Sequence, residues 1–138
     1  MPDRVKKVNY CYIKVPNRAG HGEEILRQLR ESEVDLLMYS GFPIGGGKAQ
    51  LDFVPKNMIA FRKVARKNGW RLSKAKKGFL VTGGDDLGAV HKHIRKLADA
   101  KINITAADAV AAGKGRYGMI LWVNPKQYNR AARVLGAR

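Results

Sequence analysis

The 138-residue sequence has a single cysteine, Cys11, and no long apolar run, and each shortage excludes a class of protein. One cysteine excludes an intrachain disulfide and makes a metal site built only from cysteines implausible. No uninterrupted apolar stretch approaches the length of a membrane span, and residues 1–7 lack the apolar core of a signal peptide. These absences predict a cytoplasmic protein that does not enter a membrane.

Acidic residues are also scarce. Only 11 Asp and Glu residues oppose 27 Lys and Arg residues, which gives a net charge of +16. Such a balance favours an anionic partner, such as nucleic acid, an anionic membrane surface or an acidic protein, without choosing among them. The hydrophobic content of 45% is sufficient for a packed core. The length allows one ordinary domain or two very small ones.

Signs of catalysis or metal binding are weak. His91 and His93 are two residues apart on a predicted helix and therefore lie on different faces, while His21 is distant in sequence. The Gly45–Lys48 stretch lacks the spacing and the Ser or Thr of a nucleotide-binding loop. Adjacent acidic pairs have diverging side chains, which does not favour acid–base catalysis. We therefore expect no catalytic residues, no cofactor and no metal, and a protein that is not an enzyme.

The strongest pattern is a strand, a tight turn and a helix start that occur twice. Asn17–Gly20 follows the apolar strand pattern of residues 8–15, and Asp85–Gly88 follows that of residues 77–82. Gly20 and Gly88 are 68 residues apart, and the same spacing relates several apolar pairs, namely Leu26 and Ile94, Leu29 and Leu97, Val34 and Ile102, and Leu36 and Ile104. This register predicts two copies of a βαββαβ unit, over residues 8–75 and 76–138.

The copies are not expected to be equal. In the first, Pro55 starts a second helix and Trp70–Leu72 forms a short fourth strand. Pro125 starts the corresponding helix of the second copy, 70 residues later, which indicates that one turn has gained two residues. Only three residues follow Leu135, too few for a fourth strand. Residues 1–7, the Trp70 segment or a second copy of the chain could fill that sheet edge, and the last option leads us to expect a homodimer.

These residues resemble the ACT family of small regulatory domains, in a tandem form with two units in one chain. The similarity rests on Asn17-Arg18-Ala19-Gly20, on Asp85-Asp86-Leu87-Gly88 and on Ala98–Ile104, where a helix end leads into a strand. It implies an α+β fold of two ferredoxin-like βαββαβ units side by side, the second lacking its last strand, with antiparallel sheets that carry their helices on one face. It also implies a non-catalytic regulatory module that binds an amino acid or similar small metabolite at the interface between the units.

The resemblance assigns ligand-binding roles to both turns. Asn17, Arg18, Ala19 and Gly20 would line one site, and Asp85, Asp86, Leu87 and Gly88 the other. The N–H groups of a helix's first turn can hold a carboxylate, and Asp85 or Asp86 can hold an ammonium group. Arg18 stands where Asp86 falls in the second copy, so either the two sites differ in ligand or only one works. The alternative is that each turn is simply a well-capped helix start.

A basic nucleic-acid-binding protein on the same fold is the alternative function. No Asp or Glu occurs between Asp52 and Asp85, and the interval is rich in Lys and Arg. A run of one charge sign provides a footprint for a phosphate backbone, although a solvated helix face has the same composition. The residues of this possible nucleic-acid face are Arg62, Lys63, Arg66, Lys67 and Arg71.

Overall fold

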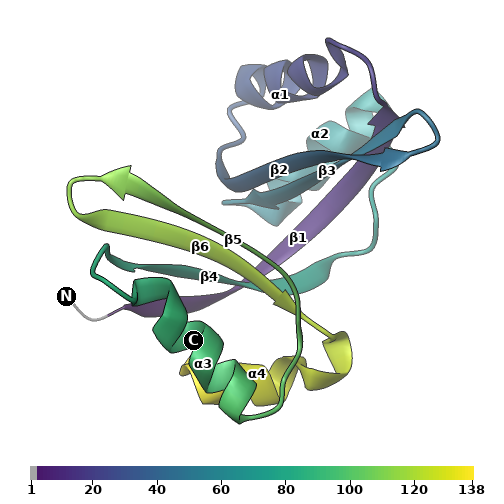
Figure 1. The fold of residues 1–138 in the computed structure, drawn as a ribbon. Helices are drawn as coiled ribbons and strands as arrows, with labels where there is room; N and C mark the ends of the chain where they lie inside the picture. Colours follow the sequence, from purple (N-terminus) through teal and green to yellow (C-terminus); the bar gives the residue numbers. More distant parts are fainter. Residues whose placement is uncertain (1–2) are drawn as a thin grey trace. The chain divides into compact units, whose positions relative to one another are not determined.

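The computed structural model describes residues 3–138, whose contacts divide the chain into two compact units (Figure 1). Unit A comprises Asn9–Lys76, and unit B comprises Lys77–Arg138 together with the start of the chain through Val8. The first strand, β1 (Arg4–Pro16), is shared, because residues 4–8 belong to unit B and residues 9–16 to unit A. Unit B is therefore discontinuous in sequence.

Unit A has three strands and two helices. Its elements after β1 are α1 (His21–Glu31), β2 (Leu36–Gly45), β3 (Lys48–Pro55) and α2 (Met58–Asn68). The strand order is β2-β3-β1, and both pairings are antiparallel. Side chains two residues apart share one face of a strand. Here the side chains on one face of β1 and β3 pack with buried residues of both helices in a single core. The core contains Cys11, Ile13, Leu51, Phe53, Ile25, Leu29, Phe61 and Val64. Both helices therefore cover the same face.

Unit B repeats this plan. Its elements after β1 are β4 (Lys76–Gly84), α3 (Ala89–Asp99), β5 (Ile104–Gly113), β6 (Arg116–Val123), the short 3₁₀-helix η1 (Pro125–Gln127) and α4 (Tyr128–Leu135). The strand order is β1-β4-β6-β5. The core lies between this sheet and both helices, and contains Val5, Phe79, Val81, Leu97, Met119, Leu121, Ala131 and Leu135. Within residues 3–138, no helix is long and apolar enough to cross a membrane.

The 68-residue repeat extends to details of the backbone. The helices α1 and α3, the strands β2 and β5, and the strands β3 and β6 begin and end at positions 68 residues apart. Both edge strands carry their irregularities at equivalent positions. The 68-residue spacing holds to the ends of β3 and β6, where Pro55 pairs with Leu36 and Val123 pairs with Ile104. The prediction that Pro55 corresponds to Pro125, with two residues gained, is therefore wrong.

The sheet edge of unit B is filled from within the chain. The start of β1 lies next to β4 in the strand order, and the backbone of Arg138 hydrogen-bonds Val5 and Lys7 at 3.1 and 3.0 Å. The reason for expecting a homodimer, an open edge, thus disappears. The predicted strand Trp70–Leu72 is also wrong, since this stretch has no strand structure. Its continuation instead meets β1 at one point, where Ser73 and Tyr12 exchange two hydrogen bonds.

Candidate functional site

The two predicted turns have the same backbone construction. The N–H of Asn17 donates to the carbonyl of Gly47 at 2.8 Å, and the N–H of Asp85 donates to Gly115 at 2.8 Å. Gly20 and Gly88 then precede α1 and α3 with φ of 95° and 80°. These left-handed conformations favour glycine, because a Cβ would be strained there. The repeated glycine thus reflects the way in which each chain segment turns from strand into helix.

The alternative of a well-capped helix start does not hold for either turn. Within residues 3–138, no side chain caps α1 at Gly20 or α3 at Gly88. By contrast, Asn57 caps α2, with its Oδ1 accepting from the N–H of Ala60 at 3.1 Å. The N–H groups of His21 and Ala89 donate to the carbonyls of Arg18 and Asp86 at 3.4 and 3.0 Å, so the N–H groups of the next two positions of each helix are those left for solvent or a ligand.

A hollow of about 300 Å³ adjoins the first turn. This open hollow is lined by residues from the end of β1, the start of α1, and the strands β2 and β3. Its polar and aromatic lining consists of Asn17, Arg18, His21, Tyr39 and Phe42. Two of the four predicted residues, Asn17 and Arg18, line it directly. Ala19 and Gly20 are exposed at the turn but do not line the hollow.

Gly22 and Tyr39 shape this hollow, and the sequence analysis missed both. A Cβ at Gly22 would lie 3.2 Å from the hydroxyl oxygen of Tyr39, so the missing side chain makes room for the ring. The Tyr39 ring also packs on Phe53, with centroids 5.4 Å apart, and partial burial raises the pKa of its hydroxyl. Val90 occupies the equivalent position of α3. The sequence did contain a signal for this feature: a glycine lies inside the first turn of a helix at the position where the repeat has a valine.

The second turn has a different surface. Its hollow of about 450 Å³ is lined by one continuous stretch, Asp85–His91, without a wall from another strand. All four predicted residues, Asp85, Asp86, Leu87 and Gly88, are among the lining and are exposed. Two carboxylates stand here where the first turn has Asn17 and Arg18, so the two turns differ in charge.

The charged residues on the exposed face of α2 are all basic. Its first turn contains no acidic residue, and within residues 3–138 none of its cations forms an ion pair with a carboxylate. Arg71, just beyond the helix, is also exposed. The exposed cations of the helix itself are Arg62, Lys63, Arg66 and Lys67.

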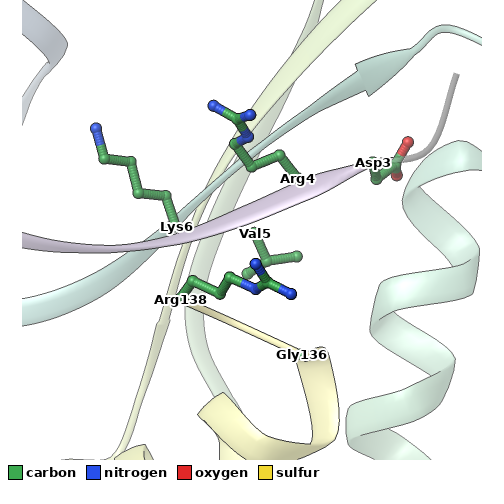
Figure 2. Close-up of a pocket in the computed structure, with 6 residues that line it drawn as sticks. All are labelled: Asp3, Arg4, Val5, Lys6, Gly136 and Arg138. Atoms are coloured by element: carbon green, nitrogen blue, oxygen red, sulfur yellow. The ribbon is translucent and has the colours of Figure 1, made fainter.

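A third hollow, of about 500 Å³, lies in unit B between the start of β1 and the residues after α4 (Figure 2). Arg4 and Lys6 extend from one side of β1, while Val5 extends from the other side, toward Arg138. The cationic side chains therefore do not converge on one point. No residue of this hollow was predicted as a site residue.

The repeated units, with helices on one face of each sheet, form the fold expected from the resemblance to tandem ACT domains. No family model and no curated protein matches the chain. Among solved structures, it is similar to protein BT0572 from Bacteroides thetaiotaomicron, with a TM-score of 0.82 at 13% identity over 96% of this chain and 88% of that one. It is also similar to the ligand-free regulatory subunit of aspartate kinase from Thermus thermophilus, with a TM-score of 0.63 at 15% identity over 99% and 95%. The regulatory subunit from Thermus flavus matches with a TM-score of 0.58 at 17% identity over 98% and 94%. These matches confirm the predicted fold.

Proposed function

We propose that this protein is a non-catalytic regulatory module whose first strand-to-helix turn binds an amino acid or a related small carboxylate. The observation that carries the proposal is the hollow beside an uncapped helix start in unit A. Its volume of about 300 Å³ lies at the lower end of small-ligand sites, roughly 300–1,000 Å³. A compact metabolite fits this space better than a dinucleotide or a large cofactor does.

The lining suits a carboxylate with an apolar substituent. The free N–H groups at the start of α1 and the guanidinium of Arg18 are donors for the carboxylate. Phe42 and Leu51 offer an apolar surface for the rest of the ligand. The lining contains no Asp or Glu, so an ammonium group would rely on neutral oxygens such as Oδ1 of Asn17. The first site therefore favours ligands with a net negative charge or an apolar side chain over cationic ones.

The regulatory role is carried over from the similar structures. Two of them are regulatory subunits of aspartate kinase, and they share this fold over nearly the whole chain. By analogy, ligand binding would alter the activity of a partner enzyme, while this chain itself performs no chemistry. The homodimer and the cytoplasmic location stay predictions.

The second turn is a weaker candidate within the same proposal. Asp85 and Asp86 supply carboxylates for an ammonium group, and Gly88 precedes an uncapped helix. However, only one stretch of chain lines its hollow, so a ligand would stay largely exposed to solvent. We therefore assign the main site to the first turn.

The experiment that tests the proposal exchanges the residues that the two units have at one equivalent position, Gly22 in unit A and Val90 in unit B. Gly22→Val installs the residue that unit B has at its equivalent position, Val90, and directs its bulk against Tyr39. A thermal-shift panel of the common amino acids should identify a stabilising ligand for the wild type, and Gly22→Val should remove that shift. Gly22→Ala, which adds only the Cβ, should weaken binding less.

The reverse exchange, Val90→Gly, serves as the control because it changes α3 and leaves the first hollow intact. It should leave the ligand shift unchanged. A flat response of the wild type across the panel would remove the proposal. Full binding by Gly22→Val would move the site away from the first turn.

Nucleic-acid binding is the second candidate function, favoured by the exposed cations of α2, which form no ion pair with a carboxylate among residues 3–138. Cations that lack carboxylate partners are available to neutralise phosphates and release counterions. A helix that carries them on one exposed face suits backbone contacts without base readout. This function would use a surface different from the first hollow, so the two proposals can be tested separately.

A further inference from the structure

A buried carboxylate with three donors lies in unit B, outside both turns. Asp3 Oδ2 is 2.6 Å from His93 Nε2, 2.8 Å from the Tyr117 hydroxyl and 3.2 Å from Lys92 Nζ. The side chains of Asp3 and His93 are only 7% and 3% exposed. In Figure 2, Asp3 lies at the start of β1, beside the helix drawn in the colour of α3. The residue comes from the chain start, and its three partners come from α3 and β6.

The equivalent positions in unit A carry apolar side chains. The positions 68 residues before His93 and Tyr117 are Ile25 and Ala49. The position equivalent to Gly83 is Val15, and a Cβ on Gly83 would collide with the Asp3 carboxylate. Where unit A has three apolar residues, unit B thus has a glycine that leaves space, two polar side chains that face that space, and an anion inside it.

We infer that Lys92, His93 and Tyr117 form a carboxylate-binding pocket in unit B, and that Asp3 is its tethered occupant. The ligand class is a small monocarboxylate, with formate and acetate as the simplest members. This inference is independent of the proposed function, because Asp3, Lys92, His93 and Tyr117 do not line the hollow of either turn.

The donors match the needs of a carboxylate. An ionised carboxylate only accepts hydrogen bonds, so Nε2 of His93 must carry the hydrogen that it shares with Asp3. Among the described residues, Nδ1 of His93 has no hydrogen-bond partner, so the imidazole ring hydrogen-bonds only through Nε2, to the Asp3 carboxylate. Hydrogen bonds to charged groups are the stronger kind, and burying an anion without them is costly. The pocket is therefore specific for an anion and unfavourable when empty.

Occupation by Asp3 also anchors a strand. The residue directly precedes β1, whose first half lies next to β4. Asp3 is tethered to the pocket through β1, so its binding is intramolecular, and a free monocarboxylate cannot enter while Asp3 is bound. Removal of the Asp3 carboxylate both vacates the pocket and weakens the docking of residues 4–8.

Chemical rescue of the full chain tests the inference. Asp3→Ala vacates the space, and sodium formate is titrated against sodium chloride at equal ionic strength. The melting temperature of Asp3→Ala should fall below that of the wild type and rise saturably with formate but not with chloride. The wild type should show no saturable formate response. Asp3→Asn is the matched control, because its amide fills the space and formate should not rescue it.

A second readout covers the case in which Asp3→Ala unfolds unit B. Formate should then restore the dispersed ¹H–¹⁵N signals of residues 77–138, and a failure to restore them would overturn the inference. Equal formate responses of Asp3→Ala and wild type would also overturn it, as would an Asp3→Ala melting temperature equal to that of the wild type. Rescue that persists in Asp3→Ala/His93→Ala would place formate elsewhere and overturn it as well. None of these outcomes depends on whether the first turn binds an amino acid.

Discussion

Removal of the Tyr117 hydroxyl isolates one bond of the Asp3 cluster. Tyr117→Phe keeps the buried ring, which is 4% exposed, and deletes the hydroxyl, which lies 2.8 Å from its acceptor on Asp3 and farther, at 3.4 Å, from the carbonyl of Ala89. A second buried tyrosine of unit B supplies the control. Tyr128 donates to the carbonyl of Gly78 at 3.0 Å, so Tyr128→Phe deletes one hydroxyl and one bond to a neutral acceptor.

The two substitutions should differ in magnitude. A hydrogen bond to a charged group contributes about 1.5–3 kcal/mol, and one between neutral groups about 0.5–1.5 kcal/mol. Asp3 retains His93 and Lys92 in the variant, so we expect a loss of about 2 kcal/mol for Tyr117→Phe at neutral pH. For Tyr128→Phe we expect about 1 kcal/mol. Urea unfolding followed at amide signals of unit B measures both.

The pH dependence distinguishes the two bonds. Burial alone raises the pKa of Asp3, but hydrogen bonds from His93, Tyr117 and Lys92 outweigh it and hold that pKa below its ordinary value. A carboxyl whose pKa is lowered by folding contributes stability above its unfolded pKa, about 3.9 for Asp, and loses it as the pH falls through the folded pKa. The penalty of Tyr117→Phe should therefore be constant from pH 5 to 7, by this reasoning, and shrink below about pH 4. That of Tyr128→Phe should not change over this acidic range.

Equal, pH-independent losses for the two variants would refute the reasoning. Such a result would mean that the Tyr117 hydroxyl contributes only an ordinary neutral bond. It would also remove the argument that Asp3 is held as an ion. A Tyr117→Phe penalty that grows as the pH falls would have the wrong sign for a carboxyl with a lowered pKa, and would contradict the cluster as described.

The remaining predictions concern α2. If the basic face binds nucleic acid, replacing its four cations by Gln should make the slope of log K against log salt concentration shallower by roughly 0.9 per lost phosphate contact. Filter binding at several salt concentrations measures this slope. Removal of four cations elsewhere, Lys101, Lys114, Lys126 and Arg133, should have a smaller effect, and no binding at low salt would dismiss the function. Asn57→Ala should cost about 1 kcal/mol through loss of the cap on Ala60, while Asn57→Gly should cost only a few tenths. Equal costs in urea unfolding would show that the cap contributes little.

Much of the fold follows from local sequence patterns. The 68-residue spacing of Gly20 and Gly88 and of the apolar pairs predicted two units of the same construction, and the structure repeats that spacing in helices, strands and bulges. Such patterns are readable because backbone twist and side-chain periodicity depend on neighbouring residues. The errors fell where the pattern was weak, as at Pro125 and at Trp70–Leu72.

By itself, the sequence determined the repeat and the turns, which follow from the order of residues along the chain, and the basic composition, which follows from the residue counts alone. Only the tertiary structure decided that residues 4–8 complete the sheet of unit B, that Gly22 and Tyr39 shape the first hollow, and that Asp3 meets His93 and Tyr117. Asp3 is 90 positions from His93 in the chain. No local preference encodes such a contact, because its free energy arises only when folding buries the carboxylate beside its donors.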